Sequence, residues 1–425
     1  MNEDFLQFLW QYRLFNEQEL ASEKGENIKI LNIGTKNSDA GPDFFNARIL
    51  YNEIEWAGNI EIHNNASDWN KHKHHQDETY DNVILHVVWN IDCEVYTSKN
   101  RPVLTIKLPV LDKTKAEYLN LYENHKLIAC SEKLKNINLP ITTYLTSLSI
   151  ARLEKKASFI YFELKESNYN WEETWYRILA YSYGLKVNAQ AFLMLAKSIP
   201  LSIIQKNVGN LLTIEALFFG QSGLLPKESS DDYVTSLINE YKYLQSKYNL
   251  TPLNSTVWKF SKIHPPSYPT MRIAQWAAFM NKNANAITDF LKVQSLKKLM
   301  DMFSCKPSPY WNEHYTFIAK TKNAKMNVGK GFINIILINS FFPFAFVYSR
   351  ERLNSQLNDW ILDMLEEMPA EKNSILKEWS VAGIIPQNAF QSQALIHLYE
   401  NYCKPRFCLR CNIGTYILLQ TKELF

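Results

Sequence analysis

The chain has 425 residues, of which 46% are apolar, so it can bury the cores of two or three domains and is not globally disordered. Its net charge of +3 is mild and does not by itself indicate a nucleic-acid partner. Only 12 glycines are present, and neither common glycine-rich phosphate-binding pattern occurs, which argues against a nucleotide-binding architecture. The six scattered cysteines predict no disulfide framework and the N-terminus lacks a secretory signal, so we expect a cytoplasmic protein.

The first part of the chain is predicted to combine one helix with a sheet. Residues 3–20 carry apolar side chains at helical spacing. Five strand-like runs follow, at residues 28–33, 44–51, 54–63, 83–89 and 103–108. Apolar residues occupy both faces of the fourth run, which predicts a central strand that is covered on both sides. We therefore predict a mixed β-sheet domain over residues 1–110, with a candidate metal site.

Beyond residue 110 the apolar spacing is helical, and residues 111–425 are predicted to form a mostly helical region that ends in a cysteine-containing element. A helix is expected to begin after Pro269. Residues 331–348 are apolar enough to be considered as a membrane span. Their amide side chains and Pro343 favour a buried core segment instead, so we expect no membrane association. The predicted fold class is α+β.

Chemistry-bearing side chains concentrate between residues 37 and 88, which hold five of the nine histidines. Asp43 lies where a turn leads into a strand, and Glu61 and His63 lie in the next strand. If the two strands form a hairpin, Asp43 and Glu61 meet at one end, and Glu61 and His63 share a face. Two carboxylates suit Mg²⁺ or Mn²⁺, which activates water and neutralises charge on a phosphate. The alternative interpretation is an ordinary turn beside a hydrated sheet face.

The histidine-rich segment allows a second metal site. If residues 67–75 are helical, Asp68, His72 and His75 share a face, and imidazoles with a carboxylate suit Zn²⁺, Fe²⁺ or Mn²⁺. This site would make the protein a His-rich transition-metal hydrolase. A solvated polar loop is the alternative. His86, within an apolar strand, is expected to be a hydrogen-bonded core residue.

Three cysteines lie close together near the C-terminus, at Cys403, Cys408 and Cys411. Thiolates at such spacing bind a structural Zn²⁺ or an iron–sulfur cluster. The sequence offers several candidates for a fourth ligand, namely His397, Cys305 and Cys130. Buried thiols without a metal are the alternative.

One arginine is a candidate substrate-binding residue. Arg272 follows a proline-rich segment near a predicted helix start, where a guanidinium could receive a phosphate. The alternative is that this segment only initiates the helix.

Several strings together resemble a bacterial family named domain of unknown function 2851. They are AGPDFFNARI (40–49), WAGNIEIH (56–63), SDWNKH (67–72), YDNVILHVV (80–88), EALFFGQSGLL (215–225), YPTMRIAQWA (268–277) and SQALIHLYENYCKPRFCLRC (392–411).

The N-terminal part also looks similar to PD-(D/E)xK nucleases, in which a helix and three strands are followed by a helix and another strand. That resemblance implies a restriction-endonuclease-like sheet with Asp43 and Glu61 as metal ligands. His63 takes the place of the lysine that orients or deprotonates the water. The leading expectation is a Mg²⁺- or Mn²⁺-dependent phosphodiester hydrolase acting on nucleic acid, with Asp43, Glu61 and His63 as catalytic residues. The alternative is a non-catalytic nucleic-acid- or protein-binding factor on a degenerate nuclease-like fold.

Overall fold

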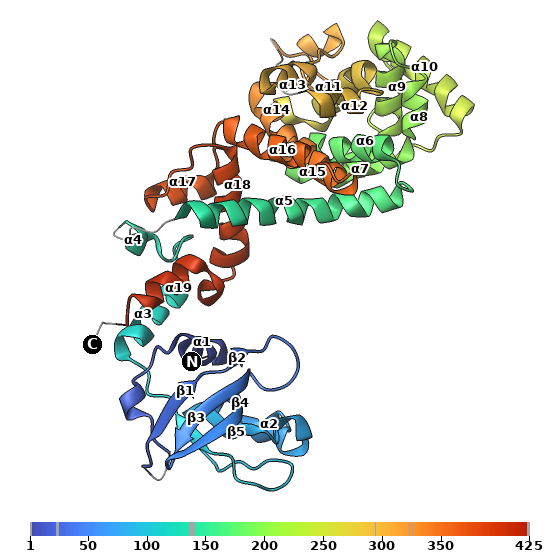
Figure 1. Ribbon diagram of the computed structural model, residues 1–425. Coiled ribbons are helices and arrows are strands. Elements are labelled where there is room, and N and C mark those ends of the chain that lie inside the picture. The colour runs from blue at the N-terminus through green and yellow to red at the C-terminus, as the bar shows by residue number, and fades with distance from the viewer. Residues whose placement is uncertain are drawn as a thin grey trace. The chain divides into compact units, whose positions relative to one another are not determined.

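The computed structural model describes residues 2–22, 25–135, 141–293, 295–322, 324 and 326–422 (Figure 1). The chain divides into two compact units. Unit 1 comprises Met1–Pro140, Lys377–Ile385 and Leu398–Phe425, and unit 2 comprises Ile141–Leu376 and Pro386–His397. Unit 1 is therefore built from both ends of the chain, whereas the sequence prediction placed a single boundary near residue 110.

Unit 1 contains all the strands of the sheet and several short helices. In chain order its N-terminal part is α1 (Glu3–Tyr12), η1 (Glu17–Glu19), β1 (Ile28–Asn32), β2 (Thr35–Lys36), β3 (Phe44–Tyr51), β4 (Ile54–Asn65), α2 (Asp68–Lys71), η2 (His74–Gln76), η3 (Glu78–Tyr80), β5 (Val83–Asn90), β6 (Thr105–Lys107), α3 (Asp112–Glu123) and α4 (Ser131–Leu134). The C-terminal segment adds η8 (Tyr399–Cys403), η9 (Cys408–Arg410) and α19 (Asn412–Leu419).

The described strands form one six-stranded mixed sheet in the order β1-β3-β4-β5-β6, with β2 paired to β3. β1, β3 and β4 are antiparallel neighbours, and β5 and β6 run parallel to β4. β5 lies between β4 and β6, so it is an interior strand, and its first six residues are buried, as its two apolar faces predicted. The α+β fold class is confirmed.

A tight hairpin fixes the register of β3 against β4. Tyr51 pairs with Ile54 across Asn52 and Glu53, which both have positive φ, the geometry of a two-residue primed turn. At the far end of the hairpin Phe44 pairs with Ile60. The start of β3 therefore lies beside the middle of β4, where β4 also pairs with β5.

Unit 2 is helical. Its helices are α5 (Ile141–Glu166), α6 (Trp171–Tyr183), α7 (Leu185–Ser198), α8 (Leu201–Gln205), α9 (Leu211–Gln221), α10 (Asp232–Tyr248), η4 (Ser255–Val257), η5 (Pro265–Ser267), α11 (Pro269–Asn283), α12 (Ile287–Lys292), α13 (Leu296–Met302), η6 (Pro309–Asn312), α14 (Lys330–Ile336), η7 (Leu337–Phe341), α15 (Phe342–Glu351) and α16 (Ser355–Glu367). α17 (Ser374–Val381) and α18 (Ala389–Leu398) cross from one unit to the other in the chain. Helices α9 and α10 approach closely because Gly220 leaves room for the ring of Tyr241.

One helical stretch, Lys330–Glu351, is long and apolar enough by length and composition to cross a membrane. Of its most apolar 18-residue window, 72% is buried inside the fold. Three of its aromatic side chains, Phe341, Phe342 and Phe344, are fully enclosed in the large core of unit 2. The expectation of a buried core segment is therefore met. Helix α11 begins at Pro269, next to the start that the proline predicted.

Candidate functional site

The β3–β4 hairpin brings Asp43 and Glu61 together. The backbone N–H of Asp43 donates to Glu61 Oε2 at 3.1 Å, and the N–H of Ile62 donates to Asp43 Oδ2 at 2.9 Å. Each carboxylate is thus held by the backbone of the strand that carries the other. Ile62 points into the core and is fully buried. The two acids lie side by side although 18 residues separate them.

Glu61 is buried and Asp43 is half-buried. Glu61 is 6% exposed, so the hydrated sheet face considered for it is wrong. Burial raises the pKa of Glu61 to about 8. Burial, and secondly the charge of Glu61, raise the pKa of Asp43 to about 7. Two acids in one buried place repel each other when ionised, and a bound cation would relieve this repulsion.

Helix α1 adds two polar residues that the sequence analysis missed. Gln7 Nε2 donates to Asp43 Oδ1 at 2.8 Å. Burial, and secondly Asp43, raise the pKa of Glu3 to about 6, so this third acid lies in the same electrostatic environment. Glu3 and Gln7 are four residues apart, on one side of a helix whose Phe5 and Leu9 are buried. Two polar residues at helical spacing beside buried apolar ones were the sequence signal that could have indicated their contact with the site.

The other oxygen of Glu61 faces histidines. Glu61 Oε1 lies 3.4 Å from His63 Nε2 and 3.2 Å from His74 Nε2. His63 is 1% exposed and His74 is 7% exposed. The ring of His74 stacks on Tyr80 with centroids 3.7 Å apart, which fixes its plane. Glu61 therefore connects the carboxylate pair to a histidine cluster.

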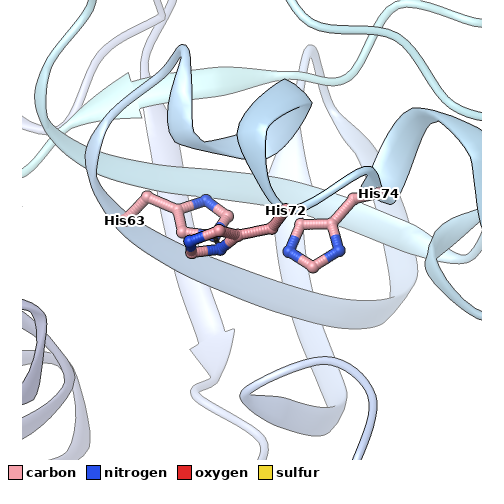
Figure 2. A group of neighbouring side chains, drawn as sticks. All are labelled: His63, His72 and His74. Carbon is pink, nitrogen blue, oxygen red and sulfur yellow. Dashed lines mark hydrogen bonds between the residues drawn. The ribbon is translucent and has the colours of Figure 1, made fainter.

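That cluster consists of His63, His72 and His74, each of which offers a ring nitrogen within 4.8 Å of the others. Figure 2 shows the three rings gathered together. His63 Nε2 lies 3.1 Å from His72 Nδ1, and His63 Nδ1 lies 2.9 Å from His86 Nε2. His86 is fully buried, as expected for a hydrogen-bonded core histidine. The surface residue of the cluster is His72.

The expectation of one helix over residues 67–75 is wrong. α2 ends at Lys71, and Lys73 adopts a left-handed conformation with φ 64°, which redirects the chain before η2 begins at His74. His75 lies outside the cluster, and its Nε2 is 3.0 Å from the Gln76 amide nitrogen. The Asp68 carboxylate accepts hydrogen bonds from the Asn65 N–H and from Lys71 Nζ rather than from a histidine. The turn at Lys73 brings His74 into the cluster in place of His75.

Burial and the neighbouring rings keep the inner histidines neutral. Burial, and secondly His86, lower the pKa of His63 to about 2. Burial lowers the pKa of His86 to about 3. A neutral imidazole can ligate a metal ion, whereas an imidazole with so low a pKa is a poor proton acceptor near neutral pH. The environment of His63 thus suits a ligand better than a base.

The three C-terminal cysteines also come together in unit 1. Cys403, Cys408 and Cys411 line a small cavity together with Cys130. Cys130 was one of the three candidates for a fourth ligand. Cys305 lies in unit 2, where its sulfur is 3.9 Å from Asn283 Nδ2. His397 belongs to unit 2 as well.

Arg272 is placed in unit 2 and is 8% exposed. Its guanidinium donates to Gln275 Oε1 at 2.8 Å and to Ser267 Oγ at 3.2 Å, and it lies 3.6 Å from the centroid of the Phe332 ring. These contacts give it a structural role at the start of α11. Phosphate binding by Arg272 stays a prediction.

The donor set of the site defines what it can do chemically. Carboxylate oxygens from Asp43 and Glu61 suit hard divalent cations, and imidazoles from His63 and His74 suit Mn²⁺, Fe²⁺ and Zn²⁺. A cation held here would lie on backbone fixed by strand pairing, which is the rigid support that a catalytic metal requires.

Comparison with curated proteins and with solved structures gave no match. A family model does match, over residues 3–374, and the matched region includes Asp43, Glu61 and the histidine cluster. It ends before the three C-terminal cysteines. By this match the chain belongs to the family described as protein of unknown function (DUF2851).

Proposed function

We propose that this chain is a divalent-metal-dependent phosphodiester hydrolase that acts on nucleic acid, with its centre at Asp43 and Glu61. The observation that carries the proposal is the carboxylate pair of buried Glu61 and half-buried Asp43, in which each acid accepts a backbone hydrogen bond from the segment that carries the other. Burying two ionised acids together is unfavourable unless a bound cation or bound protons neutralise them. A cation at this place would let both carboxylates ionise near neutral pH, and this supports a metal-binding role.

The ligands point to manganese before magnesium. Asp43 and Glu61 would supply carboxylate oxygens, and the rings beside Glu61 Oε1 would supply nitrogen. Mg²⁺ prefers oxygen alone, whereas Mn²⁺ accepts carboxylate and imidazole together. When bound, such an ion supplies an activated water and neutralises charge that develops on a phosphate.

Lys36 supplies the fixed positive charge that His63 cannot. It lies in β2, pairs with Phe44 directly after Asp43, and its charge lowers the pKa of Asp43. An ammonium group at this place attracts a phosphodiester and favours the ionised form of the carboxylate. Lys36 thereby takes the electrostatic role that the nuclease resemblance assigns to a lysine in β4.

A cleft in unit 1 offers a path for the substrate. It has a volume of about 400 Å³ and is lined by Lys36, Arg406 and Arg410 together with Tyr12 and Phe407. Cations beside aromatic rings are typical of grooves that bind single-stranded nucleic acid, because the cations hold phosphates and the rings stack on bases. Because Lys36 belongs both to the cleft and to the surroundings of Asp43, a strand in the cleft would pass near the carboxylates.

The sheet topology is in keeping with this proposal. One helix precedes the antiparallel strands β1, β3 and β4, and β5 then joins parallel to β4 after short helices. This order is similar to that of the PD-(D/E)xK nucleases. The similarity concerns the fold, and the chemistry rests on the site residues.

Cleavage of labelled single- and double-stranded DNA and RNA with Mn²⁺ or Mg²⁺ tests the proposal. Wild type is compared with Asp43→Asn and with Asp39→Asn, a matched control at an exposed position in the same loop. Wild type and Asp39→Asn are expected to cleave, and Asp43→Asn is expected to lose at least about 100-fold in rate. Equal cleavage by all three proteins, or no cleavage of any substrate, would contradict the proposal. Binding without cleavage would indicate the non-catalytic nucleic-acid-binding alternative.

The histidine cluster favours a second candidate, a transition-metal hydrolase with Glu61, His63, His72 and His74 as ligands. Three ring nitrogens within 4.8 Å of one another, with a carboxylate beside two of them, form a donor set of the right size for Zn²⁺ or Fe²⁺. Metal analysis of the purified protein separates the candidates. Zinc or iron that His72→Ala releases and Asp43→Asn retains would favour the second, because such ions are held more tightly than Mg²⁺ or Mn²⁺.

A further inference from the structure

Four cysteines from distant parts of the chain surround one cavity in unit 1. Cys130 lies between α3 and α4, Cys403 ends η8, Cys408 begins η9 and Cys411 precedes α19. All six cysteines of the chain are thiols rather than disulfides. More than 270 residues separate Cys130 from the other three, since 403 − 130 = 273. The fold therefore brings together four of its six thiols.

Backbone and side-chain hydrogen bonds hold the cysteine segments in place. Arg406 Nη2 donates to the carbonyl oxygen of Lys126 at 2.8 Å, which ties the C-terminal segment to the loop before Cys130. The N–H of Cys411 donates to the carbonyl of Cys408 at 3.3 Å. Gly414 allows α19 to approach, because a Cβ there would lie 2.1 Å from the Cys408 carbonyl oxygen. These hydrogen bonds and the close approach at Gly414 hold the segments that carry the thiols.

The spacing of the thiols favours an occupant larger than one ion. Zinc at about 2.3 Å from each sulfur places four tetrahedral ligands about 3.8 Å apart. Among the residues that the structure describes, the histidine cluster has three ligand atoms within 4.8 Å of one another. No three of the four cysteine sulfurs form such a group. An iron–sulfur cluster interposes its own iron and sulfide atoms, so its cysteines stand further apart. The sulfurs nevertheless share one cavity.

The same surroundings argue against reactive thiols. Nucleophilic or redox-active cysteines have depressed pKa values and some access to solvent. Cys403 is only 9% exposed and Cys411 only 6%. Arg406 is tied to the loop before Cys130, and its positive charge would partly balance an anionic centre.

We propose that Cys130, Cys403, Cys408 and Cys411 bind an iron–sulfur cluster that joins the two ends of unit 1. Each thiol loses its proton on ligation, and the cluster is supplied preassembled as iron and sulfide. The centre is structural: it fastens the C-terminal segment, with Arg406 and Arg410 of the cleft, to the sheet-bearing part of the unit.

Anaerobic purification of the full chain tests this. We expect a brown protein whose visible absorption bleaches on reduction with dithionite, with iron and acid-labile sulfide in equal amounts. Cys130→Ser and Cys403→Ser are expected to lose most of the iron and sulfide. Cys93→Ser, at a cysteine of unit 1 outside the cavity, is the matched control and is expected to retain them.

Two results would overturn the proposal. The first is stoichiometric zinc without sulfide in the anaerobic protein, which would identify a single-ion site. The second is a colourless protein that takes up neither iron nor sulfide on reconstitution with ferrous iron and sulfide. If a serine variant fails to fold, the comparison of wild type with Cys93→Ser and the sulfide analysis of wild type still decide the matter.

Discussion

The two candidate centres of unit 1 differ in how the chain assembles them. The carboxylate–histidine site draws its principal residues from one stretch between Asp43 and His86, and strand pairing brings them together. The cysteine centre draws Cys130 from before unit 2 and three thiols from after it. The first site offers oxygen and nitrogen donors, and the second offers sulfur alone. Their preferred metals should therefore differ, and so should their roles.

This difference has a functional consequence. An oxygen–nitrogen site binds an ion that exchanges, keeps water and can act on a phosphate. A tetrathiolate centre holds its metal tightly and adds to the stability of the fold. The proposals therefore give chemistry to the carboxylates and assembly to the cysteines, and variants at each centre should affect one property and spare the other.

The largest expected effect is on catalysis. Glu61→Gln keeps the shape of the side chain but removes the negative charge shared between Asp43 and the histidines. We expect Mn²⁺-dependent cleavage to fall by about 100- to 1000-fold, because the ion loses a ligand and its charge. Iron content should stay at the wild-type level. Loss of iron together with activity would mean that the two centres are not separate.

The next effect is on stability. Cys403→Ser removes a ligand from the centre that connects the chain ends, and we expect the free energy of unfolding of unit 1 to fall by at least about 2 kcal/mol. Denaturant titration of variant and wild type measures it, with Cys93→Ser as the reference. A stability equal to that of wild type would show that the cysteines do not fasten the unit.

Metal selectivity is the third point of comparison. His72→Ala removes the exposed member of the histidine cluster, and we expect affinity for Zn²⁺ to fall by about 10- to 100-fold, the usual consequence of losing one metal-binding contact. His75→Ala, which changes a ring outside the cluster, serves as the control. Calorimetric titration distinguishes them. Equal losses in the two variants would contradict the grouping of His63, His72 and His74.

The sequence predicted five of the six described strands, missing the two-residue β2, and it predicted the α+β class and the meeting of Asp43 with Glu61. A two-residue hairpin and a period of two residues leave little freedom of register. It did not place His74, since that depends on the left-handed turn at Lys73. Glu3 and Gln7 were missed because helix packing, rather than a motif, brings them to Asp43. Cys130 remained one of several candidates, because sequence distance carries no information on which thiols meet.

The fourth effect concerns pH. In metal-free protein the pKa of Asp43 is about 7 and that of Glu61 about 8, above the ordinary values of 3.8 and 4.5. At a pH between the ordinary and the raised pKa values, the unfolded chain has released protons that the folded chain keeps. The free energy of unfolding should therefore fall as pH rises from about 4 to about 8. Added Mn²⁺ needs ionised carboxylates, so the rise in Tm that it produces should grow over the same window. Thermal unfolding in EDTA and in Mn²⁺ measures both trends.

Asp43→Asn provides the control for this pH effect, because its amide cannot ionise. We expect a flatter pH profile in EDTA and a smaller response to Mn²⁺. An unchanged profile would show that Asp43 keeps an ordinary pKa in the folded protein, contrary to its burial beside Glu61.

The smallest effect is expected at Lys36. Lys36→Ala should weaken nucleic-acid binding several-fold and reduce the slope of log affinity against log salt by about one, the change expected for one lost phosphate contact. Lys29→Ala, at an exposed position of β1 outside the cleft, should leave the slope unchanged. Identical slopes for the two variants would remove Lys36 from the substrate path.

The most direct test of the assignment of the two centres is a crystal structure of the anaerobic protein grown with Mn²⁺, with anomalous data collected at the manganese and iron edges. We predict a manganese peak between Asp43 and Glu61 and an iron peak amid Cys130, Cys403, Cys408 and Cys411. The absence of manganese at the carboxylates under saturating Mn²⁺ would contradict the account, as would manganese bound by the histidines alone.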